Sequence, residues 1–225
     1  MFGMPQQTPF DIRFSLFRIP VSVGPFFWLI ALIICSNFRD GKMVAIGMFA
    51  VFLAILVHEL GHALVIRYIF GASPWVMLHG FGGLTFHQPP YYYRTPRHAG
   101  RILISLAGPM AGFLLSFLCL FLVYRFGEEK LGTYLNFLLN VLGFIGIVWG
   151  VINLLPVYPL DGGQICREIC QWIAPKRGVR VSLYISAVTG IVAAMLGLWT
   201  RNVFLILFFG LFAYQSIQML QMRRY

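Results

Sequence analysis

The sequence predicts an all-α membrane protein with about six transmembrane helices, and its composition and apolar runs lead to this fold class. Of its 225 residues, 59% are hydrophobic and 11% are charged, and the mean hydropathy is +0.80. Soluble domains are far less apolar. The apolar runs expected to span a membrane are residues 20–36, 43–66, 101–123, 134–155, 181–199 and 203–220. This length fits a single polytopic membrane domain over residues 1–225.

The basic residues indicate how these spans are oriented, because cytoplasmic loops carry an excess of Lys and Arg. If both termini are cytoplasmic, twelve of the 17 basic residues fall inside and five outside. The twelve are Arg13, Arg18, Arg67, Arg94, Arg97, Arg101, Arg167, Lys176, Arg177, Arg180, Arg223 and Arg224, and the five are Arg39, Lys42, Arg125, Lys130 and Arg201. Since these charges are scattered between spans and are not clustered with aromatic residues, no nucleic-acid partner is expected.

The second span contains His58-Glu59-Leu60-Gly61-His62, which places three ionisable side chains in an apolar helix. Histidines four residues apart lie on one helix face, one turn apart, and can hold one zinc ion. Glu59 can reach a water at that metal and act as general base. Ionisable groups are costly in lipid, so they indicate function there. The motif therefore predicts a catalytic metal site.

A catalytic zinc ion normally has three protein ligands, so a further ligand is expected elsewhere in the chain. Asp161 is the acidic residue near the end of the fourth span, in the segment NLLPVYPLDGG at residues 153–163. Pro156 and Pro159 interrupt the helix before it, and two glycines after it allow a tight turn. Asp161 alone could simply cap the next helix. Because the expected topology places Asp161 on the same membrane side as the two histidines, Asp161 is the candidate third ligand.

These two motifs, in this order, resemble those of the site-2 protease family of intramembrane zinc metalloproteases. That family has HExxH in one span and an Asn–Pro–Pro–LDG segment in a later one. Residues 105–112, SLAGPMAG, are similar to the family's Ala-Gly-Pro stretch, and the glycines of residues 80–83 stand in the usual intervening loop. The resemblance covers roughly residues 20–165.

The resemblance implies one Zn²⁺ per chain on His58, His62 and Asp161, with Glu59 as general base. It also places Asn153 near the reacting carbonyl, where a side-chain amide can stabilise an oxyanion. The alternative is that Asn153 only hydrogen-bonds backbone groups freed by the following proline. The implied fold has a small membrane-associated β-hairpin or sheet in the loop after the HExxH helix, and residues 75–78 and 84–87 suit its strands.

The implied activity is hydrolysis of peptide bonds within or next to transmembrane segments of membrane-protein substrates, for regulated intramembrane proteolysis or the clearance of remnants. The edge of the small sheet could pair with an unwound substrate, or the loop could be an interfacial segment anchored by aromatic residues. The implied location is the lipid bilayer of a prokaryotic plasma membrane. No PDZ or CBS domain is expected, so regulation would have to come from an unidentified regulatory membrane protein or from gating by the first, fifth and sixth spans.

Other interpretations remain open at this point. A metal or proton transporter would use the same ionisable residues, but it would also need polar residues along several spans and inverted repeats, and neither is evident. An inactive scaffold would not need intact motifs. Zinc suits two His and one Asp best, although other divalent ions bind similar ligands. Cys166 and Cys170 could be metal ligands or a redox pair, and reduced packing thiols are favoured.

Overall fold

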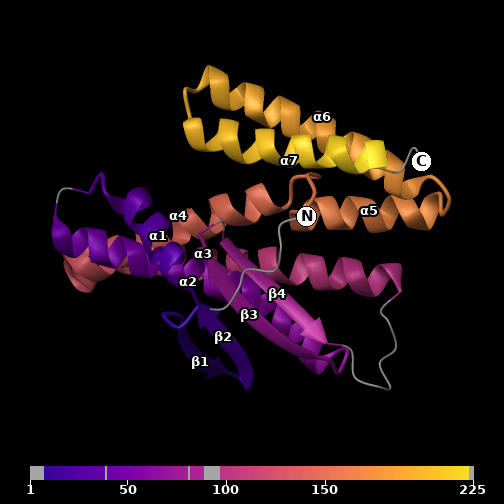
Figure 1. Cartoon of the computed structure of the whole chain (residues 1–225). Coiled ribbons are helices and arrows are strands. Elements are labelled where there is room, and N and C mark those ends of the chain that lie inside the picture. The colour runs from indigo at the N-terminus through magenta and orange to yellow at the C-terminus, as the bar shows by residue number, and fades with distance from the viewer. Residues whose placement is uncertain (1–7, 39, 81, 89–96, 223–225) are drawn as a thin grey trace. The chain divides into compact units, whose positions relative to one another are not determined.

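The computed structural model describes residues 8–38, 40–80, 82–88 and 97–222. Helices dominate the fold, and a small sheet accompanies them, as the sequence predicts (Figure 1). The elements are β1 (Ile12–Leu16), β2 (Ile19–Val23), α1 (Pro25–Cys35), α2 (Gly41–Tyr68), β3 (Ser73–His79), β4 (Gly82–Gln88), α3 (His98–Leu131), α4 (Thr133–Asn153), α5 (Asp161–Ile173), α6 (Gly178–Trp199) and α7 (Val203–Met222).

Five of the described helices, α2, α3, α4, α6 and α7, are long and apolar enough to cross a membrane. They match the expected spans from residue 43 onward, and the chain is an integral membrane protein. The expected first span, residues 20–36, is different: it consists of β2 followed by the 11-residue helix α1. At about 1.5 Å per residue, α1 is roughly half as long as the hydrocarbon core is thick. Hydropathy alone cannot separate an apolar strand and short helix from one long helix.

The chain divides into two compact units, Met1–Thr95 with Ala107–Gly150, and Pro96–Leu106 with Val151–Tyr225. The first unit contains a four-stranded sheet in the order β1-β2-β3-β4, with the strands side by side in Figure 1. The β1–β2 and β3–β4 pairs are antiparallel and β2–β3 is parallel. The expected strands at 75–78 and 84–87 are therefore confirmed as parts of β3 and β4. Residues 89–96, which belong to the same loop, lie outside the described residues.

The N-terminal hairpin was not expected from the sequence. Its two-residue turn has positive φ at Phe17 (50°) and Arg18 (61°), as a type I′ hairpin turn requires, but it lacks the Asn or Gly that usually signals one. Strand β2 joins β3 in parallel through the crossover α1–α2, which a parallel pair needs. Alternate residues of both strands, including Val21 and Val76, face a core shared with α1 and α2.

In the second unit, α6 and α7 pack against each other, and α5 packs against α6. A cluster of buried apolar side chains joins the segment before α5 to α7, including Val157, Leu160 and Phe209. Hydrogen bonds add to this packing. The backbone N–H of Tyr158 donates to Ser186 Oγ over 2.8 Å, and Ser186 Oγ lies 2.7 Å from Ser216 Oγ. The irregular segment that leads to α5 is thus fixed by α6 and α7.

Candidate active site

The two histidines of the HELGH motif lie together inside the first unit. Because α2 is apolar on nearly all faces, the fold buries it, and His58 and His62 are only 2% and 7% exposed. Their Nε2 atoms are 3.3 Å apart. Two ligands of a tetrahedral zinc ion with Zn–N bonds of about 2.0–2.1 Å are separated by about 3.3–3.4 Å. The spacing of the two nitrogens therefore fits one shared zinc ion.

Small residues let α3 approach this part of α2 closely. A Cβ on Gly61 would lie 2.8 Å from the Cβ of Ala111, and a Cβ on Gly108 would lie 2.8 Å from Cδ2 of His62, with other ring atoms closer still. Glycine at these positions therefore lets the α3 backbone pack directly against the helix and the imidazole. Gly108 belongs to the SLAGPMAG stretch, which thus has a packing role beside the site.

Strand β4 packs on the other ionisable residue of the motif. Glu59 is 5% exposed, and the hydroxyl of Thr85 donates to its Oε2 over 2.7 Å. Sequence reasoning found Glu59 but missed Thr85. The sequence signal was the short strand at 84–87, but nothing in a strand pattern shows which residue of a distant helix it will contact.

The segment that carries Asp161 belongs to the second unit. Asn153 ends α4 and is 8% exposed, and Asp161 begins α5 and is 7% exposed. The N-cap of α5 is Leu160, so Asp161 is the first helical residue and not its cap. A carboxylate in the first turn is favoured by the helix dipole. A Cβ on Gly163 would lie 2.5 Å from the Tyr158 nitrogen, so glycine is needed for this tight turn.

His58, His62 and Asp161 are buried side chains of the kinds that bind metal ions. Two imidazole nitrogens and a carboxylate oxygen are ligands typical of catalytic zinc. The histidines lie in the first unit and Asp161 in the second. Their joint use as ligands is therefore part of the function proposed below.

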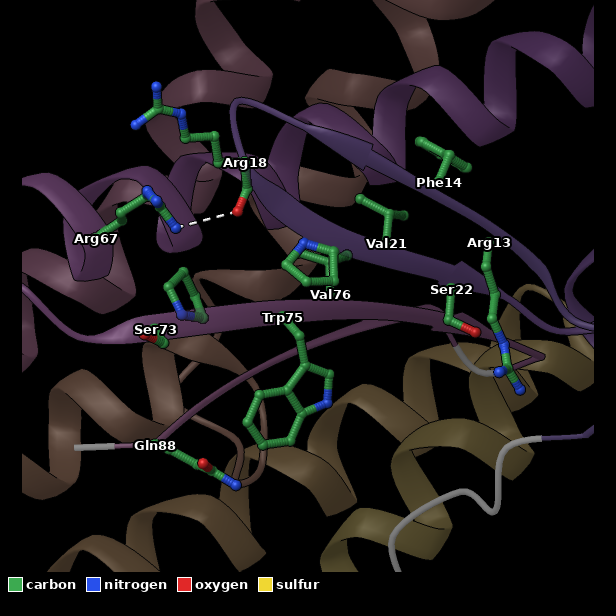
Figure 2. A pocket seen from close by; sticks show the side chains of 12 residues that line it. Arg13, Phe14, Arg18, Val21, Ser22, Arg67, Ser73, Trp75, Val76 and Gln88 are labelled. Atoms are coloured by element: carbon green, nitrogen blue, oxygen red, sulfur yellow. Dashed lines mark hydrogen bonds between the residues drawn. The ribbon is translucent and has the colours of Figure 1, made fainter. Parts of the chain in front are cut away.

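A cavity of about 600 Å³ lies on the first unit. It is lined by residues of β1–β4, the hairpin turn and the end of α2, and no residue of the HELGH motif lines it. Figure 2 shows Arg67 at the end of α2 reaching the carbonyl of Arg18, a hydrogen bond of 3.1 Å. This bond ties the hairpin turn to the helix that carries the histidines.

The four cysteines, Cys35, Cys119, Cys166 and Cys170, are free. Burial, with a smaller contribution from the neighbouring Cys170, raises the pKa of the Cys166 thiol to about 11. A thiol with such a pKa stays protonated at neutral pH. Because the thiolate is the form that binds metals and exchanges disulfides, these observations favour reduced packing thiols.

Known proteins that resemble this chain in sequence or structure include zinc metalloproteases. A family model described as peptidase family M50 matches residues 128–197, which include Asp161 but not the HELGH motif. The zinc metalloprotease MJ0392 of Methanocaldococcus jannaschii is 28% identical over 212 residues, or 91% of this chain, so that alignment contains both motifs. A solved structure titled site-2 protease from Methanocaldococcus jannaschii matches with a TM-score of 0.65 and 25% identity, over 93% of this chain and 94% of that one. Over most of its length, the chain is similar to this site-2 protease.

Other relatives are matched over less of the chain. Stage IV sporulation protein FB of Bacillus subtilis is 30% identical over 156 residues, which cover 65% of this chain. The chain spans 59% of the length of the M. jannaschii metalloprotease and 46% of the length of the sporulation protein. What those longer proteins do is therefore only a proposal for this chain.

Proposed function

We propose that this protein is an intramembrane zinc metalloprotease that hydrolyses peptide bonds within or next to transmembrane segments. The observation that carries the proposal is the pair of buried imidazoles with Nε2 atoms 3.3 Å apart, next to a buried carboxylate, in a helix long enough to cross a membrane. Proteins matched over most of the chain are named zinc metalloproteases, which supports the same activity. Neither the structure nor the comparisons support the transporter alternative.

The proposed zinc ligands are His58, His62 and Asp161. The donor set supports this assignment, because two neutral imidazoles and one carboxylate leave a fourth position open for a water or a substrate. Gly108 supports it too, since any larger side chain there would displace the His62 ring. When bound, zinc would act as a Lewis acid that polarises a carbonyl group and lowers the pKa of a water molecule.

Two side chains of the protein supply the remaining chemistry. The Glu59 carboxylate accepts the proton of the attacking water and delivers it to the leaving nitrogen. Asn153 donates a side-chain N–H to the developing oxyanion, and its burial at the end of α4 suits such a role. Asp161 is held on the first turn of α5 by the glycine turn behind it.

The proposed substrate is a membrane protein with a transmembrane helix that must unwind locally, because a helix hides its carbonyls in hydrogen bonds. Strand β4 is the edge strand of the sheet, and among the described residues it pairs with β3 alone. An unwound substrate segment can add to such an edge through backbone hydrogen bonds. A regulatory membrane protein is a further proposed partner.

The proposed location is a prokaryotic plasma membrane with both termini in the cytoplasm. The distribution of basic residues supports this orientation. The parallel β2–β3 pair supports it as well, because it places the N-terminal strands beside the strand that follows the end of α2. The relatives matched come from archaea and bacteria. Tags at each terminus, tested for protease accessibility in oriented vesicles, would detect an opposite orientation.

Cleavage of a co-expressed panel of tagged single-span proteins tests the function, with Glu59→Gln as the inactive variant and metal content measured on both purified proteins. We expect the wild type to cut, and Glu59→Gln to retain about one zinc per chain while its activity falls at least about 100-fold. Chelation should abolish cleavage, and added zinc should restore it. If neither protein retains metal, the ligand assignment is wrong. If Glu59→Gln cuts as fast as the wild type, Glu59 is not the base.

A further inference from the structure

Strand β4 touches the general-base candidate at two points. The Thr85 hydroxyl oxygen lies 2.7 Å from Oε2 of Glu59 and 3.1 Å from its backbone carbonyl oxygen. A hydroxyl has one proton to donate, and the carboxylate oxygen is both nearer and the stronger acceptor when ionised. The short distance is typical of an O–H group donating to a carboxylate. Thr85 therefore holds one oxygen of Glu59.

The second contact is made at Gly83, where the absence of a side chain leaves room for the Glu59 carboxylate. A Cβ at this position would lie 2.6 Å from both Cδ and Oε1 of Glu59, closer than real Cβ atoms approach. Residues 83 and 85 are two apart in a strand, so both face α2. The same face of β4 thus offers a hydroxyl to Oε2 and, at Gly83, just enough room for Oε1.

These contacts matter because a free glutamate has several rotamers of similar energy. Within the first unit, α2 brings Glu59 into a buried environment where few polar groups can orient it. General-base catalysis depends on a carboxylate held at hydrogen-bond distance from the proton it accepts. A donor at Oε2, together with the restricted space at Oε1, selects one orientation of the group.

We propose that Thr85 is a positioning residue for Glu59, and that β4 sets the orientation of the carboxylate together with α2. The proposal rests on the function proposed above, with Glu59 as base. Thr85 acts through Glu59 and does not itself touch the reacting atoms. The same orientation also requires glycine at position 83, since a larger residue there would displace the Glu59 carboxylate.

The test compares Thr85→Val, which keeps the shape and removes the hydroxyl, with Thr85→Ser, which keeps the hydroxyl. We expect Thr85→Val to lower kcat about 10- to 100-fold with KM and zinc content nearly unchanged, and Thr85→Ser to stay within about threefold of wild type. Thr200→Val is the matched control, because the Thr200 hydroxyl bonds the Leu196 and Gly197 carbonyls at the end of its own helix. Its activity should equal that of the wild type. Equal activity of Thr85→Val and wild type would overturn the proposal.

A second measurement does not depend on cleavage. Infrared difference spectra of the purified protein should show a carboxylate stretching band that Glu59→Gln removes and Thr85→Val shifts. In the Glu59→Gln background, Thr85→Val should change nothing in that region. An unshifted band overturns the Thr85 assignment even if no substrate is found. If the band shifts but the protein cuts no substrate, the contact between Thr85 and Glu59 stands and the proposed protease function is wrong.

Discussion

The hydrogen bonds around Ser186 allow a quantitative test of how the segment before Asp161 is held. Ser186 and Ser216 are 1% and 0% exposed. Ser216 donates its proton to the Phe212 carbonyl over 3.0 Å, so Ser186 donates to Ser216 and accepts from the Tyr158 N–H. The Ser186 hydroxyl thus joins α6, α7 and the irregular segment through two bonds.

Replacing Ser186 by alanine removes both bonds at little cost in volume. The Tyr158 N–H loses its acceptor, and an unsatisfied buried donor costs about 1–3 kcal/mol. Because that bond is only partly buried, we expect the free energy of unfolding to fall by about 1–2 kcal/mol. Ser182 is the matched control: it is also buried on α6, but its hydroxyl donates only to the Val179 carbonyl of its own helix. Ser182→Ala should cost less than about 0.5 kcal/mol.

The assay is reversible unfolding in mixed detergent micelles, followed by circular dichroism, for wild type and both alanine variants. Ser216→Ala completes a double-mutant cycle with Ser186→Ala, and their coupling energy should be about 0.5–1.5 kcal/mol. If Ser186→Ala costs no more than Ser182→Ala, the hydroxyl does not hold the segment, and packing of apolar side chains must do so alone.

Two further predictions concern the polar groups of α5. The pKa of Cys166 is raised to about 11, so the rate of its alkylation should keep rising about tenfold per pH unit beyond pH 9.5. Mass spectrometry can follow this rate, and a plateau near pH 9 would contradict the prediction. Glu168 accepts from Arg101 over 3.1 Å and from His98 over 2.7 Å. Arg101 is 51% exposed, so water weakens this ion pair. A double-mutant cycle of Glu168→Gln and Arg101→Gln should give a coupling free energy of unfolding of only about 0.5–1 kcal/mol. Zero coupling would show that water replaces the bond.

The sequence determined the features that depend on local periodicity and residue type. Long apolar runs became α2, α3, α4, α6 and α7, because every backbone group in lipid must be satisfied inside its own helix. The i, i+4 spacing of His58 and His62 placed both imidazoles on one face, because that is a property of the helix itself. The same local reasoning failed at residues 20–36, where an apolar strand and a short apolar helix have the hydropathy of one span.

Only the tertiary structure decided which distant segments meet. The parallel pairing of β2 with β3 joins residues more than fifty positions apart, and no turn signal in the sequence announces it. Thr85 meets Glu59 across 26 positions, and Glu168 meets Arg101 across 67. Such contacts form because packing minimises empty space and buried polar groups that lack hydrogen-bond partners. They follow from the shapes of whole elements, whereas a local pattern records only the neighbours along one of them.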